Sequence, residues 1–87
     1  MSNVQATLDE RGNRYGDFTD NAELSQALKH VIEVSVSWQD RMTPLHREGL
    51  TMILQKIARI VNGDPNYADN WHDIQGYARL VEERLPK

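Results

Sequence analysis

Beyond residue 20, apolar residues recur with a period near 3.6, and no stretch alternates for long enough to form a β-strand. The pattern predicts an all-α protein whose protomer has three principal helices, at about residues 21–40, 44–61 and 69–84. Residues 1–20 contain two glycines, many polar side chains and the isolated apolar residues Leu8, Tyr15 and Phe18, so we expect a short turn or helix and then a loop, packed on the other helices. Residues 21–87 then form a single helical domain.

Local signals set the boundaries of these helices. Thr43 is a good N-cap residue, and Pro44 follows it at the first helical position, where a missing N–H does no harm. The sequence Asn-Gly-Asp-Pro at residues 62–65 ends this helix, because glycine followed by proline is typical of helix C-termini. The β-branched residues within 31–36 lower the helix propensity of the first helix, so packing must stabilise it.

The composition indicates one small domain that needs a further source of stability. The chain has 87 residues, of which 39% are hydrophobic and 26% are charged, as in ordinary soluble domains. A domain of this length buries only about 60–65% of the surface that its unfolded chain exposes. It contains no cysteine, which excludes disulfides and cysteine-based zinc sites, and its three histidines lack zinc-ligand spacing. A partner subunit is the stabiliser that remains.

Charge and hydropathy narrow the function classes. The net charge of −3 argues against a partner nucleic acid bound through its phosphate backbone, although a local basic cluster could still bind one small anion. No run approaches the roughly 20 apolar residues of a membrane span, and the N-terminus lacks the apolar stretch of a signal peptide. We therefore expect a cytoplasmic protein with no membrane partner.

The two later helices each carry a second stripe, opposite the apolar arc, that three helices alone do not bury. These stripes comprise Glu48, Met52, Gln55 and Arg59 on one helix and Asp69, Asp73, Gly76 and Leu80 on the next. Charged stripes are usually exposed to solvent, but Met52 and Leu80 are apolar. Gly76 lowers helix stability by about 1 kcal/mol relative to alanine. These three residues favour a second layer of helices from another copy, so we expect a homodimer or a dimer of dimers.

The charged members of these stripes have two interpretations. Asp69 could cap its helix and Asp73 could complement the helix dipole, or the pair could supply oxygen ligands to Mg²⁺. Lys56 and Arg59 could complement a helix C-terminus, or they could bind phosphate oxygens beside the metal. No nucleophile triad, phosphate-binding loop or dinucleotide fingerprint is present, so hydrolysis through a covalent intermediate is not expected.

Three motifs resemble a known group of proteins. They are Arg14-Tyr-Gly-Asp-Phe18, Lys56-Ile-Ala-Arg59-Ile, and Asp69-Asn-Trp-His-Asp73-Ile-Gln-Gly76-Tyr77-Ala78. From Arg11 to about Glu82 the chain resembles small phage and prophage proteins of unknown function, and the last two motifs are similar to MazG-like members of the all-α nucleoside triphosphate pyrophosphohydrolase superfamily.

The resemblance implies a dimeric helical bundle that cleaves a nucleoside triphosphate between its α and β phosphorus atoms, with Mg²⁺ as cofactor. Carried over by position, the catalytic and metal-binding residues are Glu48, Asp69 and Asp73. Lys56, Arg59, Asn70 and Tyr77 are implied to bind or surround the nucleotide. The chain departs from the superfamily pattern because Glu48 has Thr51 and Met52 where a second carboxylate is expected.

The departure keeps a second hypothesis open. In it, the protein is a non-catalytic phage or prophage accessory protein, an acidic helical dimer that binds a host protein or a nucleotide. A purely structural subunit is a third, weaker interpretation.

Overall fold

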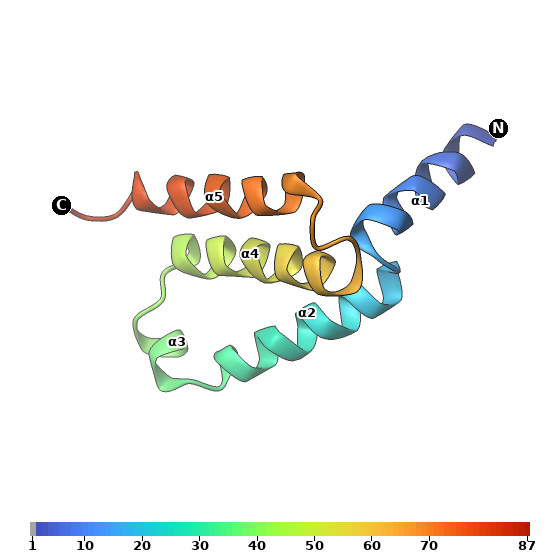
Figure 1. The fold of residues 1–87 in the computed structure, drawn as a ribbon. Helices are drawn as coiled ribbons and strands as arrows, with labels where there is room; N and C mark the ends of the chain where they lie inside the picture. Colours follow the sequence, from blue (N-terminus) through green and yellow to red (C-terminus); the bar gives the residue numbers. More distant parts are fainter. Residues whose placement is uncertain (1) are drawn as a thin grey trace.

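The computed structural model describes residues 2–87, which form five helices and no strand (Figure 1). The helices are α1 (Ser2–Tyr15), α2 (Phe18–Glu33), α3 (Val36–Asp40), α4 (Pro44–Asn62) and α5 (Ala68–Glu82). The all-α prediction is confirmed, whereas the division into three helices is wrong. None of the described helices is long and apolar enough to cross a membrane.

Residues 2–15 form one continuous helix, α1, where the sequence indicated a short turn or helix followed by a loop within residues 1–20. The helix contains good helix formers such as alanine, glutamine, leucine and glutamate, and its apolar residues Val4, Leu8 and Tyr15 repeat at helical spacing. Gly12 weakens this pattern without ending it. Isolated apolar residues and two glycines are therefore poor grounds for expecting a loop in this part of the chain.

The helix predicted at residues 21–40 begins earlier and is broken near its end. Asp17 caps α2, and its side chain accepts a hydrogen bond from the N–H of Asp20 at 3.2 Å. The helix stops at Glu33, inside the β-branched run, and Ser35 is the N-cap residue of the short helix α3 that follows. The low helix propensity of this run favours a break here, and the break turns the buried Trp38 back toward α4.

The predicted boundaries of the later helices hold to within two residues. Pro44 opens α4 after the N-cap Thr43, whose N–H donates to Nδ1 of His46 at 3.0 Å. Gly63 ends α4. Helix α5 starts at Ala68 with Tyr67 at the N-cap, so Asp69 lies in the first turn and does not cap the helix.

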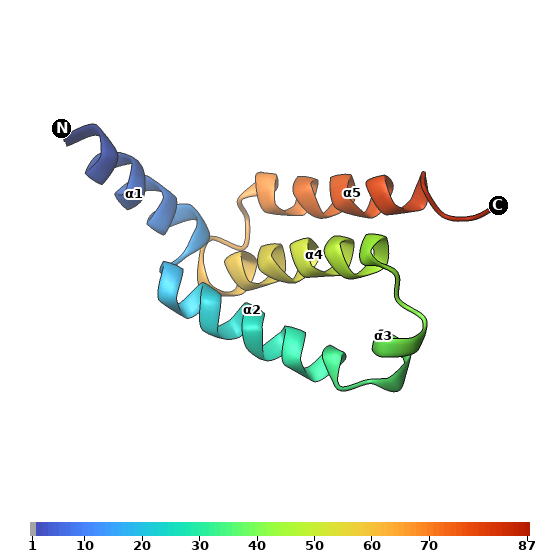
Figure 2. The same ribbon diagram turned by 180° about the vertical axis from the view of Figure 1, so that it is seen from behind.

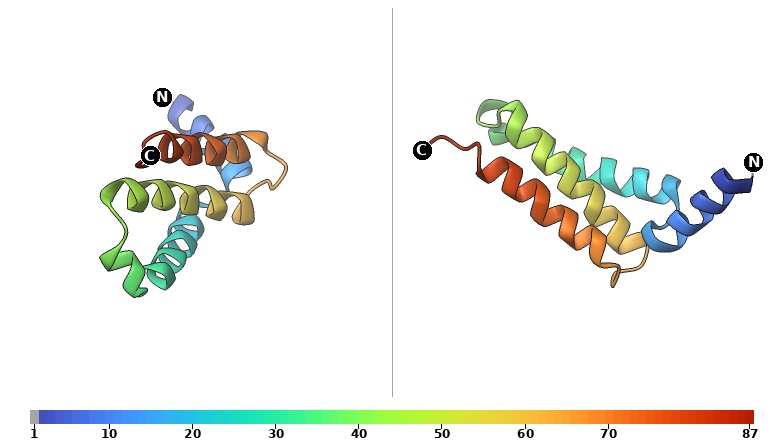
Figure 3. Two further views of the ribbon diagram at one scale, coloured as in Figure 1. Left: turned by 90° about the vertical axis from the view of Figure 1, so that its left-hand side faces the viewer. Right: turned by 90° about the horizontal axis from the view of Figure 1, so that it is seen from above.

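Helices α2, α4 and α5 lie in a row with α4 in the middle (Figures 1 and 2). Gly49 of α4 lies against Val81 of α5, and Asn62 of α4 donates a hydrogen bond to Asn21 of α2 on the other side. Helices α2 and α5 do not pack on each other. The result is a single layer of helices from which α1 projects at one end (Figure 3).

This layer has two unlike faces, because the side chains that α4 does not direct at its neighbours project to either side. One side, here called the polar face, carries Glu48, Gln55 and Arg59 beside Gln26 of α2 and Asp73 of α5. The opposite side, here called the apolar face, collects the apolar arcs of all three helices. Its members are Leu24, Leu28 and Val31 of α2, Leu50, Ile53, Ile57 and Val61 of α4, and Trp71, Ile74 and Ala78 of α5.

The chain has a thin hydrophobic core. Among the described residues, Trp38 and Ala58 are the buried hydrophobic side chains, and the largest fully buried side chain is the polar Asn70. The radius of gyration is 15.0 Å, against about 12 Å for a compact domain of this length. One layer of helices leaves each helix half uncovered, which explains both observations.

A close backbone contact attaches α1 to the layer. Gly16, between α1 and α2, has φ of 87° and lies against the backbone of Asn62, where a Cβ atom would not fit. Gly63 approaches the backbone of residues 14–16 equally closely, and the N–H of Asp64 donates to the carbonyl oxygen of Arg14 at 3.0 Å. These two glycines bring the end of α1 onto the end of α4.

Candidate functional site

A groove of about 640 Å³ lies where α1, α2 and α4 meet on the polar face. This volume is within the range of about 300–1,000 Å³ that small-molecule sites occupy. Its chemistry is set mainly by two arginines, two aromatic rings and two amides, namely Arg11, Arg59, Tyr15, Phe18, Gln26 and Gln55. Of these, Arg59 alone belongs to the substrate-binding residues expected from the sequence.

The two arginines flank one aromatic ring. The guanidinium carbon of Arg59 lies 4.8 Å from the ring centroid of Tyr15, and that of Arg11 lies 5.6 Å from it. Within residues 3–87 neither guanidinium forms an ion pair with a carboxylate. The carboxylate of Asp17 also lines the groove, where it caps α2. The two guanidiniums, which have no ion-pair partner among these residues and both contact the Tyr15 ring, form a basic cluster in a protein with a net negative charge.

A hydrogen-bonded chain stands beside the groove and ties α1 to α5. Arg14 donates from Nη1 to the hydroxyl oxygen of Tyr67 at 2.8 Å, and that hydroxyl donates to Oδ2 of Asp69 at 2.8 Å. The hydrogen bond to Asp69 raises the pKa of Tyr67, and the bond to Tyr67 together with Glu10 raises the pKa of Arg14. Asp69, expected as a metal ligand, therefore has a structural partner.

Lys56 and Asp73 form an ion pair between α4 and α5. The Nζ atom of Lys56 lies 3.2 Å from Oδ2 of Asp73, and the lysine side chain is only 9% exposed against 44% for the aspartate. Burying an ammonium group is costly unless a counter-ion accompanies it, so Asp73 stabilises the helix pair. Sequence spacing places Asp73 beside the like charge of Asp69 but does not reveal this lysine partner on another helix.

Asn70 is fully buried, and neither its Oδ1 nor its Nδ2 atom has a hydrogen-bond partner among the described residues. A ligand in the groove cannot touch it in this conformation. Buried amides are nearly always hydrogen-bonded, so this side chain is unusual.

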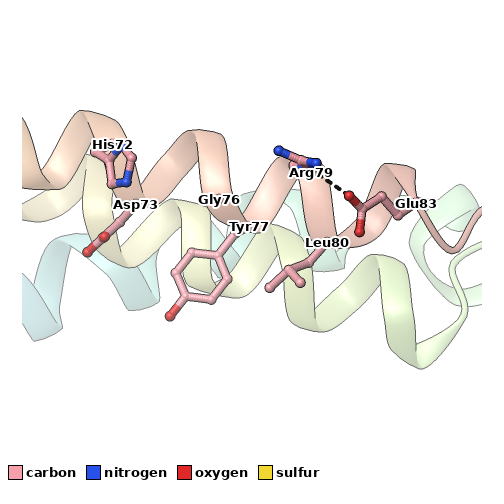
Figure 4. A pocket seen from close by; sticks show the side chains of 7 residues that line it. All are labelled: His72, Asp73, Gly76, Tyr77, Arg79, Leu80 and Glu83. Carbon is pink, nitrogen blue, oxygen red and sulfur yellow. Dashed lines mark hydrogen bonds and ion pairs between the residues drawn. The ribbon is translucent and has the colours of Figure 1, made fainter.

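Glu48 and Tyr77 lie toward the other end of the α4–α5 pair. The antiparallel register sets Gly49 against Val81 and Lys56 against Asp73, so Glu48 lies about two helical turns from Asp73 and further from Asp69. Tyr77 lies on α5 between Asp73 and Leu80, lining shallow grooves of that helix (Figure 4). The residues expected at one site are thus distributed along α4 and α5, and two of them, Lys56 and Asn70, are buried.

The carboxylates do not fit a magnesium site within one protomer. Nowhere in the described chain do three or more His, Asp or Glu side chains gather as a metal-binding group. Asp69 and Asp73 are bonded to Tyr67 and Lys56, and the register of the helices keeps Glu48 away from both.

The sequence reasoning missed Arg11, Tyr15 and Phe18 as groove residues because it predicted no more than a short turn or helix and then a loop for residues 1–20. A usable signal was present. Arg14-Tyr-Gly-Asp-Phe18 belongs to the motifs that carry the resemblance, and Gly16 within it marks the turn that folds α1 onto α4.

Comparison with known families gives one match. A family model described as a domain of unknown function (DUF6378) matches residues 2–85, which is nearly the whole chain. No curated protein and no solved structure shows significant similarity to the chain.

Proposed function

Since the chain belongs to the DUF6378 family, whose function is unknown, we propose a function from the groove itself: the protein binds a nucleotide through its phosphates on the polar face. The observation that carries this proposal is the pair of guanidiniums of Arg11 and Arg59 on Tyr15, without acidic partners in the described chain. This is the non-catalytic alternative among the hypotheses drawn from the sequence, with the ligand specified.

The arginines supply the phosphate recognition. A guanidinium presents a planar set of N–H donors that matches the oxygens of a phosphate group, and it keeps its charge at every physiological pH. Stacking on Tyr15 holds both side chains in position before a ligand arrives, which lowers the entropic cost of binding. A di- or triphosphate could engage both guanidiniums at once.

Phe18 supplies a surface for the base. Its side chain lines the groove and is 84% exposed, which is unusual for phenylalanine. Stacking of a nucleobase on an exposed aromatic ring contributes about 1–3 kcal/mol. The amides of Gln26 and Gln55 can donate to and accept from a base or a sugar. Together these groups favour a nucleotide over inorganic phosphate.

Cleavage of the nucleotide is the second candidate, and the Lys56–Asp73 pair favours it. Asp73 is half exposed on the same polar face, so its free oxygen can accept a hydrogen bond from a water molecule. The resemblance to MazG-like pyrophosphohydrolases supplies the expected reaction, release of pyrophosphate from a nucleoside triphosphate. The isolation of Glu48 from the other carboxylates favours binding without turnover.

Binding is tested by titrating ATP, dATP and tripolyphosphate into the protein in a calorimeter, with and without Mg²⁺. We expect nucleotides to bind more tightly than tripolyphosphate. Arg59→Gln should weaken nucleotide binding by about 10- to 100-fold, because a hydrogen bond to a charged group contributes about 1.5–3 kcal/mol. Phe18→Ala should remove the preference for nucleotide over tripolyphosphate.

The matched control is Arg41→Gln, which removes the same charge from the exposed end of α3 and should leave affinity unchanged. Equal weakening by both arginine substitutions would reduce the effect to net charge and contradict the proposal. A pyrophosphate-release assay over the common NTPs and dNTPs with Mg²⁺ separates the two candidates. Turnover that Asp73→Asn abolishes and Asp40→Asn preserves would establish cleavage, and binding without turnover would exclude it.

A further inference from the structure

The apolar face is the part of the molecule that the proposed function does not use. Along α4 from Leu50 to Val61, the two charged residues, Lys56 and Arg59, both point away from it. Several of its side chains are well exposed for their type, including Val31 at 68%, Val61 at 65% and Trp71 at 52%. No described helix packs over this face (Figures 1 and 3).

The solvent-accessible surface area of the molecule is larger than that of a typical folded monomer of its mass. The accessible surface is 6520 Å², whereas a folded monomer of this mass exposes about 5,200 Å². Helix α1 contributes part of this excess because it projects from the layer. The total excess exceeds the roughly 800 Å² that each partner buries in a standard protein interface.

We propose that a second copy of this chain covers the apolar face, so that two layers of helices pack face to face around one shared core. Folded domains bury apolar helix faces between at least two layers, and the protomer supplies one. An uncharged apolar face is complementary to itself, as a two-fold symmetric interface requires. Both grooves remain open on the outer, polar faces of such a dimer.

This interface differs from the one that the sequence suggested. The earlier expectation placed the second copy on the stripes that contain Met52, Gly76 and Leu80, and those residues lie on the polar face. The new location follows from the layer, in which the arcs predicted to form the core of one protomer face outward. The proposal does not depend on nucleotide binding, and neither fails with the other.

Sedimentation equilibrium of the full chain at micromolar concentrations tests the proposal. We expect twice the protomer mass of 10.0 kDa. Val61→Glu places a charge in the proposed interface and should raise the dimer dissociation constant at least tenfold. Leu80→Glu makes the same kind of change at a side chain that is 47% exposed on the polar face, and it should leave the dimer intact.

Because Val61→Glu could unfold a chain with so small a core, thiol labelling gives a second measurement. The protein has no cysteine, so Val61→Cys and Leu80→Cys each introduce a single reactive group. Labelling at position 61 should slow at least tenfold as the concentration rises through the dissociation constant, while labelling at position 80 should not change. A monomeric wild type, a dimer that dissociates with Leu80→Glu but not with Val61→Glu, or protection at position 80 alone would overturn the proposal.

Discussion

Asn70 lies in the first turn of α5 with its side chain fully buried and both amide atoms without a hydrogen-bond partner in the described chain. An amide transferred from water into such an environment costs about 1–3 kcal/mol. In a domain whose total stability is of the order of 5–10 kcal/mol, this is a large fraction.

Replacing Asn70 tests that cost. Asn70→Leu keeps a similar volume and removes both unsatisfied atoms, so we expect the free energy of unfolding to rise by about 1–3 kcal/mol. Asn70→Asp should lower it, because a buried carboxylate lacks a counter-ion there. Thermal unfolding of the three proteins by circular dichroism measures both changes. Destabilisation by leucine would show that Asn70 is in fact hydrogen-bonded.

The residues of the candidate site were only partly predictable. Arg59 was expected to bind substrate and does line the groove of about 640 Å³, because helical periodicity is enough to place it on the polar face. The pairing of Lys56 with Asp73 depends on the register of two packed helices, which spacing within one helix does not encode. The same register separates Glu48 from both aspartates.

At the scale of the helices, the sequence predicted α4 and α5 closely because their ends carry strong signals. These signals are local, since they consist of Thr43 with Pro44 and Gly63 with Pro65, and no tertiary contact overrides them. The full extent of helix α1 was not predicted because its stripe of apolar residues is sparse. The break before α3 was missed because weak helix propensity does not reveal which residue a chain bends at.

Alanine substitutions at two glycines in these helices should change the stability of the protein in opposite directions. A Cβ atom on Gly49 would collide with Val81 of α5, whereas one on Gly76 meets nothing within 4 Å. Gly49→Ala should therefore destabilise the protein by about 1–3 kcal/mol despite its better helix propensity. Gly76→Ala should stabilise it by up to about 1 kcal/mol.

Urea unfolding of the two glycine variants measures these changes. A gain for both would show that α4 and α5 can separate freely, which contradicts the close contact at Gly49. A loss for Gly76→Ala would show that another molecule packs against α5 at this point, as the sequence interpretation of Gly76 supposed.

The whole molecule is a layer of helices with an apolar face, where we propose assembly, and a polar face, where we propose ligand binding. The sequence predicts that a small chain without cysteine needs help from a second copy, and this stays a prediction; its apolar arcs could not show whether they face one another or face outward. Three helices of this length could have formed a closed bundle. The row with α4 in the middle leaves the apolar face uncovered and places the groove of Arg11, Tyr15 and Arg59 on the opposite face.

The central claim is that a nucleotide binds in this groove on the polar face, and backbone NMR of ¹⁵N-labelled protein titrated with ATP tests it most directly. We predict saturable shifts of the amide signals of residues 11–18 and of Gln55 and Arg59, with the signals of Val31, Leu50 and Trp71 on the apolar face unmoved. Shifts confined to the apolar face, or none at millimolar ATP, would contradict the claim.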